Sequence, residues 1–444
     1  MWKRLGAALL FLLAFGPLGL AQSVLSVSDL HFNPFADPAL VPKLEAADSS
    51  QWEAIFESSS ATAFSPSGSD VNDPLLQSAL GEMRKQVQSP AFVLISGDFL
   101  AHRFDQTYQQ YATDKSQAAY SAFVTKTIAY LASTFAKTYP GVRIYPTLGN
   151  NDSDCGDYAV APGGAFLAGF RNAWRPIVGA ASFDRRFAAG GYYHADVPRL
   201  RRVRVIVLNT NFFSTKYQNP CGTPVPDPGA AELEWLDAEL ALARREGKHV
   251  WLLFHIPPGI DVYDTVEYGG SCPNVKTQSF WKDQYTHEYL RIVAAYRRTI
   301  LGAFAGHTHQ DEFRFAGHDF VHITPSISPV FGNNPAFEEM EVTRGGEIAN
   351  ITAWHLPNVT LPWVREYSFD EAYGKRRYDG ATLTQLAAAV AADPTTREKY
   401  FTYSSSGNAK STGEALVAWQ SYWCGLRAMT GPAMTACACQ PSTP

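Results

Sequence analysis

The chain has 444 residues, of which 46% are hydrophobic and 13% aromatic. A chain of this length and composition can bury a large core in one domain or two, and extensive disorder is excluded. Charged residues make up only 18%, the net charge is −5 and no long run of one sign occurs, so neither a nucleic-acid groove nor a polybasic membrane patch is indicated.

The first 21 residues have the features of a signal peptide. A short positive start, MWKR, precedes an apolar stretch that ends in Gly19-Leu20-Ala21, where small residues suit cleavage. An uncleaved membrane anchor is the alternative, but Gly16-Pro17 interrupts the stretch and leaves it short for a span of ~20 residues. We therefore expect an exported chain that begins at Gln22, in a periplasmic, extracellular or lumenal compartment, with no transmembrane helix after cleavage.

Six short apolar runs follow, and each is predicted to be a buried strand: 24–27, 92–95, 143–147, 203–208, 250–254 and 300–305. Helical patterns lie between them, and the clearest covers residues 230–247, with Leu233, Leu236 and Leu240 on one face. Strands that alternate with helices predict an α/β fold, in which central β-sheets are flanked by helices.

Nearly every predicted strand ends at a side chain that can bind a metal or move a proton. These residues are Asp29, His31, Asp98, Asn150, His255, His307 and His309. Ligands of open α/β sheets bind beyond the carboxyl ends of the strands, so we expect this set to gather at one edge. A single GD turn or a lone histidine is more often structural, whereas the ordered set DxH, GD, GN, H and GHTH is a specific signal.

The residue types in this set suit a pair of metal ions. Two divalent cations about 3.5–4 Å apart can clamp a phosphoryl group and hold a hydroxide between them. Asp98 is the candidate for the carboxylate that bridges the ions, while Asp29 and His31, two residues apart, can grip one ion together. Mixed oxygen and imidazole ligands favour zinc, with manganese or iron as alternatives.

The sequence resembles the calcineurin-like metallophosphoesterases and, within them, the acid sphingomyelinase-like phosphodiesterases. The resemblance rests on motifs between Ser23 and Phe337, which read SDLHFNP, SGDFLAH, TLGNND, FHIPPG, FAGHTHQDEF and SPVFGNNPAF. A weaker echo covers residues 419–430. The resemblance implies one metal held by Asp29, His31, Asp98 and His309, another held by Asp98, Asn150, His255 and His307, and attack on phosphorus by metal-bound hydroxide.

The motif TLGNND departs from the family pattern at Asn151. The family usually has a histidine there, which is credited with stabilising or protonating the leaving group, and an amide cannot donate a proton in that sense. A GNND form is also seen in the related endopolyphosphatases, whose anhydride leaving groups need less protonation. His102, four residues after Asp98, is a second candidate acid; its alternative interpretation is a surface loop histidine.

The last hundred residues differ in character from the rest. Residues 341–355 predict a final pair of strands, residues 369–423 are mostly helical in pattern, and no catalytic set occurs among them. We therefore divide the chain into a signal peptide (1–21), a metallophosphoesterase catalytic domain (22–345) and a C-terminal strand and helical subdomain (346–444).

Other polar residues receive simpler interpretations. Asp70 lies in a Ser/Pro-rich loop, residues 58–74, which is predicted to be solvated or to form a flexible rim. His318 and His322 flank an apolar run and are interpreted as structural.

Six cysteines in an exported chain predict disulfides rather than metal ligands or nucleophiles. Cys221 and Cys272 flank the strand before His255, and Cys424 and Cys437 flank a short helical hairpin. We expect both pairs to be bonded. Cys155 and Cys439 stay unassigned, although a bond between them is possible.

Three functions are compatible with these patterns. The first is an exported two-metal phosphodiesterase acting on phosphocholine-type or nucleotide phosphodiesters. The second, favoured by Asn151, is an endopolyphosphatase or another enzyme that cleaves pyrophosphate bonds. The third is a non-catalytic binding protein stabilised by its metals, which the complete ligand set argues against. The expected partners are small phosphodiesters, nucleotides or polyphosphate, and the oligomeric state is left open.

Overall fold

The computed structural model describes residues 22–440, so the predicted signal peptide lies outside the described residues. One six-stranded sheet has the order β14-β13-β12-β1-β2-β3. Its strands are β1 (Gln22–Val27), β2 (Phe92–Ile95), β3 (Arg143–Pro146), β12 (Ala336–Val342), β13 (Ile348–His355) and β14 (Val364–Ser368).

A second six-stranded sheet has the order β10-β11-β9-β6-β5-β4. Its strands are β4 (Tyr193–Asp196), β5 (Val203–Val207), β6 (His249–Leu253), β9 (Ile300–Ala305), β10 (Glu312–Ala316) and β11 (Asp319–Ile323). The six strands expected from sequence are thus confirmed within a residue or two. A small ribbon, β7 (Ile260–Asp261) with β8 (Gln278–Ser279), lies apart from both sheets.

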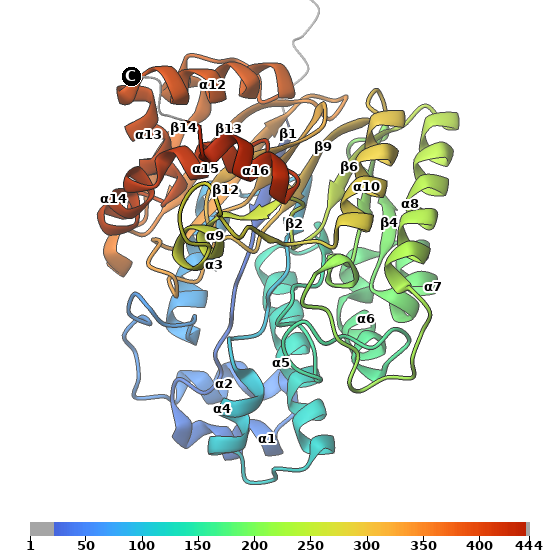
Figure 1. Cartoon of the computed structure of the whole chain (residues 1–444). Helices are drawn as coiled ribbons and strands as arrows, with labels where there is room; N and C mark the ends of the chain where they lie inside the picture. The colour runs from blue at the N-terminus through green and yellow to red at the C-terminus, as the bar shows by residue number, and fades with distance from the viewer. Residues whose placement is uncertain (1–21, 441–444) are drawn as a thin grey trace, which may run out of the picture.

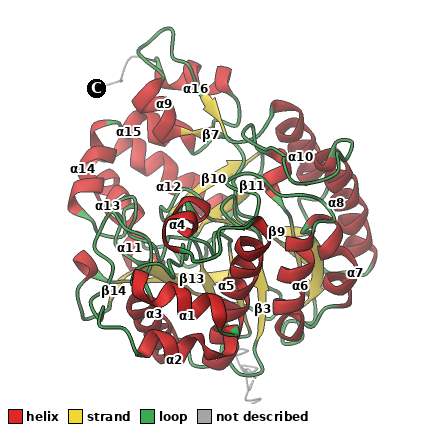
Figure 2. Cartoon of the chain, turned by 90° about the horizontal axis from the view of Figure 1, so that it is seen from below, coloured by secondary structure: helices red, strands yellow, loops and turns green. Residues whose placement is uncertain are grey.

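The two sheets face each other and enclose the core. The ring of Phe92 on β2 lies 5.5 Å from that of Trp251 on β6, and the hydroxyls of Ser26 and Thr324 are 2.7 Å apart. Every residue of β2 and of β5 is buried, which explains their unbroken apolar sequences. Helices cover the outside, as the view in Figure 2 shows.

The helices between the strands are numbered in chain order in Figure 1. They are α1 (Val41–Ala46), α2 (Trp52–Glu57), α3 (Asp73–Gln86), α4 (Phe104–Tyr111), α5 (Gln117–Thr138), α6 (Ala165–Val178), α7 (Ala181–Gly190), α8 (Pro228–Arg245), α9 (Val262–Tyr268) and α10 (Asp283–Ala295). The predicted helix 230–247 corresponds to α8, where Asp227 caps the first turn and Leu233, Leu236 and Leu240 are buried.

Parallel pairing places the catalytically interesting strand ends together. β1, β2 and β3 are parallel in the first sheet, and β5, β6, β9 and β11 are parallel in the second. Because the sheets face each other, the segments that follow β1, β2, β3, β6 and β9 meet at one edge of the sandwich.

The strand pair predicted over residues 341–355 corresponds to the end of β12 and to β13, whereas β14 was not predicted; the helices predicted after residue 369 are present. The helices are α11 (Phe369–Tyr373), α12 (Gly380–Ala392), α13 (Pro394–Ser404), α14 (Ala409–Val417), α15 (Trp419–Gly425) and α16 (Gly431–Ala438). Helices α12 to α16 lie together beside β13 and β14, at the upper left of Figure 1. β13 and β14 lie beyond residue 345 but extend the first sheet from β12, and the division of the chain at that residue stays a proposal.

The disulfides correct one sequence prediction. Cys424–Cys437 is bonded as expected, but the other two bonds are Cys155–Cys221 and Cys272–Cys439, so the predicted Cys221–Cys272 pair is wrong. The reason is tertiary: the segment around Ala159 runs parallel to that around Gln218, which brings Cys155 beside Cys221. Cys272 is meanwhile close to the end of α16, where its sulfur lies near the Ala438 carbonyl.

Among residues 22–440, no helix is both long enough and apolar enough to cross a lipid bilayer.

Candidate active site

The structure brings all seven predicted metal-ligand side chains together at the shared edge of the two sheets. Six are buried, and His307 is half-buried. Asp29 and His31 follow β1, Asp98 follows β2, Asn150 follows β3, His255 follows β6, and His307 and His309 follow β9.

The backbone that presents these side chains is unusual. Five of them have left-handed backbone: Asp29 (φ 50°), His31 (φ 41°), Asp98 (φ 53°), His307 (φ 78°) and His309 (φ 62°). Such a conformation in a non-glycine residue costs on the order of 1–3 kcal/mol and persists only where surrounding structure enforces it. Here the loops after β1 and β2 are paired, since the Asp29 amide donates to the Gly97 carbonyl and the His31 amide to the Asp98 carbonyl.

Hydrogen-bond acceptors converge around His255. Its Nδ1 is 2.7 Å from the Ser96 carbonyl, so a neutral ring carries its proton there and offers a lone pair at Nε2. That Nε2 faces Oδ1 of Asn150 at 3.1 Å and Oδ2 of Asp98 at 3.2 Å, both of which are also acceptors. The Nδ1 atom of His307 lies 3.3 Å away on the same side. These four atoms can all offer lone pairs to one point, which suits a shared cation; without one, a proton on an imidazole nitrogen must separate them.

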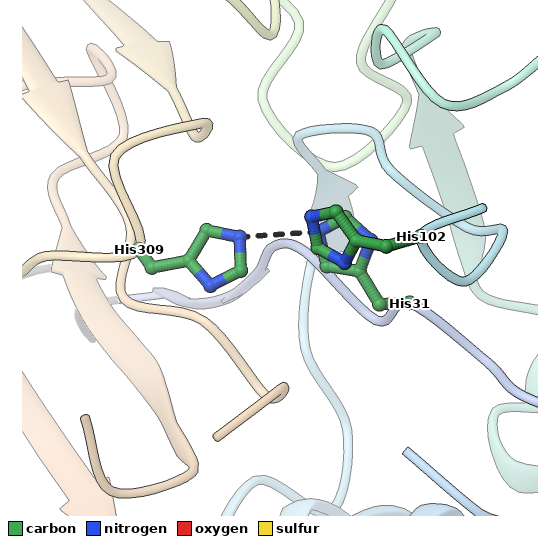
Figure 3. Close-up of side chains that lie close together, drawn as sticks. All are labelled: His31, His102 and His309. Atoms are coloured by element: carbon green, nitrogen blue, oxygen red, sulfur yellow. Dashed lines mark hydrogen bonds between the residues drawn. The ribbon is translucent and has the colours of Figure 1, made fainter. Parts of the chain in front are cut away.

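A second convergence lies on the other side of Asp98. Nδ1 of His31 is hydrogen-bonded to the Leu100 carbonyl. Its Nε2 lies 3.1 Å from Nε2 of His309, and the dashed line in Figure 3 marks this contact. Oδ2 of Asp98 is 3.4 Å from the same His31 atom, and Oδ1 of Asp29 is 3.4 Å from Nε2 of His309. The carboxylate of Asp98 therefore belongs to both groups, as a bridging ligand must.

The electrostatics of the site support ionised carboxylates. Burial opposes charge on Asp29 and Asp98, but the surrounding imidazoles outweigh it and hold the pKa of both carboxyls well below the usual range. Burial lowers the pKa of His31 and His255, but the negative charge of Asp98 outweighs this effect. It raises the pKa of His31 to about 10 and that of His255 to about 9. Without a metal, protons on the imidazoles therefore offset the repulsion between the lone pairs that meet in the site. Divalent cations would offset the same repulsion and leave the imidazoles neutral, as metal ligands must be.

Two glycines allow the loops to approach one another. A Cβ on Gly149 would lie 2.0 Å from Oδ1 of Asp98, and one on Gly306 would lie 2.0 Å from Oγ of Ser28. The glycines of the GN and GH motifs are therefore required by close packing around the two aspartates.

Several supporting residues were missed from sequence. Asp152 accepts hydrogen bonds from the amides of Phe99, Leu100 and Gly149, which joins the loops after β2 and β3. Its position as the acid of TLGNND was the available signal.

Asp157 and Tyr158 carried no such signal, because they match no motif. Asp157 accepts from Nδ2 of Asn150 at 2.7 Å and so turns the Oδ1 of that amide toward His255. The hydroxyl of Tyr158 lies 3.3 Å from Nε2 of His307. Asn211 donates to the Gly149 carbonyl.

His102 stands beside the second convergence and is held by a carboxylate. Its ring stacks on that of His31 with the centroids 4.0 Å apart, and Figure 3 shows the two rings overlapping. Oδ1 of Asp70 is 2.9 Å from Nδ1 of His102, and the His102 amide donates to Oδ2. Asp70 is mostly buried, so the prediction of a solvated or flexible rim is wrong for this residue: its loop folds back onto the site.

Asn151 contacts the bridging candidate directly. Its backbone amide donates to Oδ1 of Asp98 and its side-chain Nδ2 to Oδ2, both at 2.9 Å. The side chain that stands at the family's histidine position is thus engaged with a carboxylate.

The chain matches no established protein-family profile. It is 25% identical over 425 residues to acid sphingomyelinase-like phosphodiesterase 3b of Mus musculus, across 89% of this chain and 86% of that protein. It is 29% identical over 329 residues to sphingomyelinase phosphodiesterase D of Dictyostelium discoideum, across 69% and 66%. It is 23% identical over 352 residues to cyclic GMP-AMP phosphodiesterase SMPDL3A of Bos taurus, across 74% and 72%. A solved dimetal phosphatase from Danio rerio aligns with a TM-score of 0.43 and 12% identity, over 78% of this chain and 98% of that one.

Two facing sheets whose shared edge carries the DxH, GD, GN, H and GHTH residues define a calcineurin-like phosphoesterase, and the chain is an enzyme of this class. The curated relatives are sphingomyelinase-like and cyclic-dinucleotide phosphodiesterases. Within the class, the curated relatives that the chain matches are the acid sphingomyelinase-like phosphodiesterases, the same group that its motifs resemble.

Proposed function

We propose that the chain is an exported phosphodiesterase that uses two divalent cations to hydrolyse small phosphodiesters of the phosphocholine or nucleotide type. The observation that carries the proposal is the double convergence of electron-pair donors on Asp98. Oδ2 of this one carboxylate lies within 3.4 Å of both His31 and His255, which belong to separate groups.

The residues present fit a pair of metal ions. One ion would be held by Asp29, His31 and His309, and the other by Asn150, His255 and His307. Asp98 would bind both ions. Nitrogen and oxygen ligands of this kind favour zinc and are compatible with manganese or iron. When bound, such ions activate water and neutralise the charge on phosphoryl oxygens.

The chain's own residues then orient the ligands and move protons. The Ser96 and Leu100 carbonyls fix which nitrogen His255 and His31 present, and Asp157 does the same for the amide of Asn150. His102 is the candidate donor to the leaving oxygen. Its Nδ1 faces Asp70, so Nε2 is the atom free to protonate an alkoxide.

Asn151 supports a second candidate substrate class, the phosphoanhydrides. Its amide is hydrogen-bonded to Asp98 and cannot serve as an acid, so one proton donor of the family pattern is replaced by an amide. Anhydride leaving groups depart as stable anions without such help. Pyrophosphate or polyphosphate cleavage is therefore the alternative activity that the assay must include.

Export is part of the proposal because three disulfides link the described part of the chain. Disulfides persist in oxidising compartments outside the cytosol.

The proposal is tested on the purified mature chain. Elemental analysis should find two ions that depend on Asp98, and Asp98→Asn should lose at least one of them and nearly all hydrolysis of bis-p-nitrophenyl phosphate. A panel of sphingomyelin, CDP-choline, ATP and polyphosphate then ranks the substrate classes. A fully active enzyme with one ion or none would refute the two-metal proposal, and exclusive cleavage of polyphosphate would select the alternative.

A further inference from the structure

A second buried cluster of ligand-type side chains lies outside the active site. Asp311 precedes β10, His322 lies on β11 and Glu338 lies on β12, so the cluster joins both sheets. One nitrogen or oxygen from each of the three side chains lies within 4.8 Å of the others. Exposure is 7% for Asp311 and 0% for His322 and Glu338, which places the group in the protein interior.

The contacts within the cluster leave acceptor capacity unused. Nε2 of His322 lies 2.6 Å from Oε2 of Glu338, and its Nδ1 lies 2.7 Å from the hydroxyl of Tyr378. Tyr367 donates to Oδ2 of Asp311. Oε1 of Glu338 is buried and has no hydrogen-bond partner, which is costly for a carboxylate oxygen away from water.

A third buried acidic side chain lies near the cluster. The side chain of Glu366, on β14, is only 4% exposed, and neither of its oxygens accepts a hydrogen bond. Burial first, and then the charges of Asp311 and Glu338, raise the pKa of Glu366 well above its usual range. Within residues 22–440 the only charged partners of Glu338 and Glu366 are His322 and His355, so no lysine or arginine balances them.

A small cavity adjoins the cluster. Its volume is about 20 Å³, and its lining includes Asp311, Tyr367, Tyr378, Tyr400 and Tyr403. A space of this size holds one water molecule or one small ion, and hydroxyls and carboxylates supply it with polar partners.

We propose that Asp311, His322 and Glu338 form a third divalent-cation site, distinct from the two-metal active site. Two carboxylates and one imidazole suit zinc or manganese, and the cavity leaves room for a water or tyrosine hydroxyl as a further ligand. The cation would take the place of the hydrogen bond between His322 and Glu338 and give the unpartnered Oε1 atom a ligand. It would join β11 of one sheet to β12 of the other, with Asp311, two residues after His309, as the third ligand.

Counting metals in matched variants tests this site. We expect three ions per chain in the wild-type mature protein loaded with Zn²⁺, and two in Glu338→Gln, which keeps the side-chain shape. Asp98→Asn should lose ions of the active site and keep the third. Glu339→Gln is the matched control: Glu339 is the next residue on β12, bonds to Ser23 on the neighbouring strand and should leave the count at three.

Two results would contradict the proposed third cation site. One is a wild-type protein with no more than two ions that loses all of them in Asp98→Asn. The other is a Glu338→Gln protein with the wild-type count. If Glu338→Gln does not fold, anomalous scattering at the zinc edge from wild-type crystals decides instead, because density must lie between the three side chains. The count after Asp98→Asn keeps this test separate from the proposed activity.

Discussion

Asp157 illustrates how a residue behind a candidate ligand can decide which atom that ligand presents to the site. The amide of Asn150 has a donor end and an acceptor end, and only the acceptor end can bind a cation. Because Asp157 takes the donor end, Oδ1 faces His255. The Ser96 and Leu100 carbonyls act in the same way on the imidazoles of His255 and His31. The ligand set is thus oriented by acceptors placed behind it.

Gly149→Ala should remove activity although the substitution adds only one carbon. The new Cβ would lie 2.0 Å from Oδ1 of Asp98, so either the carboxylate or the loop after β3 must move. Displacement of a catalytic group by about 1 Å can cost about 10²-fold in rate. We expect a fall of that size in kcat together with lower metal content. Gly81→Ala, inside helix α3, is the control for adding a Cβ where nothing lies within 4 Å, and an equal loss there would contradict the explanation.

The partnership of His102 with Asp70 makes a prediction about leaving groups. His102→Ala should slow substrates with alkoxide leaving groups by about 10²–10⁴-fold, the usual contribution of general acid catalysis, and hardly affect p-nitrophenyl esters. Asp70→Asn should show the same selectivity with a smaller loss, about 10-fold or more, because it removes the group that orients the ring.

The measurement is kcat across leaving groups of graded pKa for both variants and the wild type. Asn151→His, which restores the family's residue, should help alkoxide substrates most. Equal losses for good and poor leaving groups in His102→Ala would show that this histidine shapes the site or binds phosphate instead.

The sequence predicted well which side chains gather at the sheet edge, but it predicted their supporting residues poorly. Each ligand follows a strand and lies in a short motif, so local pattern and parallel-sheet geometry suffice to bring them together. Asp70 and Asp157 reach the site from loops, and no periodicity or motif indicates where a loop will fold. Asp70 was therefore placed at the solvated rim, although it bonds to His102.

At the scale of elements, the disulfides stabilise loops that carry the site. Cys155 lies between Asn150 and Asp157 in the loop after β3, and its bond to Cys221 joins that loop to the segment after the η3 turn (Thr210–Phe213). Spacing along the chain suggested the wrong partner for Cys221 because the pairing depends on how two distant loops lie side by side, which the strand and helix patterns do not encode.

Replacing both Cys155 and Cys221 by serine should therefore affect stability and the site together. The bond closes a loop of 66 residues, and the chain-entropy relation gives a stabilisation of about 4 kcal/mol. We expect a lower free energy of unfolding in denaturant titrations and weaker retention of the metal near Asn150. Peptide mapping of the wild-type protein checks the premise: a Cys221–Cys272 peptide would contradict it.

At the scale of the whole molecule, the C-terminal segment completes the catalytic fold. β13 pairs with β12 along its length, and β14 pairs with β13, so the first sheet draws half of its strands from residues 336–368. The indole of Trp251, in the second sheet, donates to the carbonyl of Gly346. The sequence predicted strands in this region, but it did not indicate that β12 pairs with β1, more than 300 residues earlier.

A chain that ends at residue 345 should accordingly fail to fold. Its first sheet would lose β13 and β14. The strand β12, which carries the buried residues Phe337 and Met340, would lose its pairing with β13. The expected result is insoluble protein, or soluble protein without a cooperative thermal transition by circular dichroism. A soluble, metal-loaded fragment would instead support an independent catalytic domain with its boundary at residue 345.

The left-handed backbone at five ligand positions has a consequence for how this chain can evolve. Glycine at Asp29, His31, Asp98, His307 or His309 would relax the backbone, so each position holds its side chain against local conformational preference. If the proposed metal sites were lost, substitution by glycine or asparagine at these positions would stabilise the fold. The strained backbone therefore indicates, from one sequence alone, that these side chains serve a purpose other than local stability.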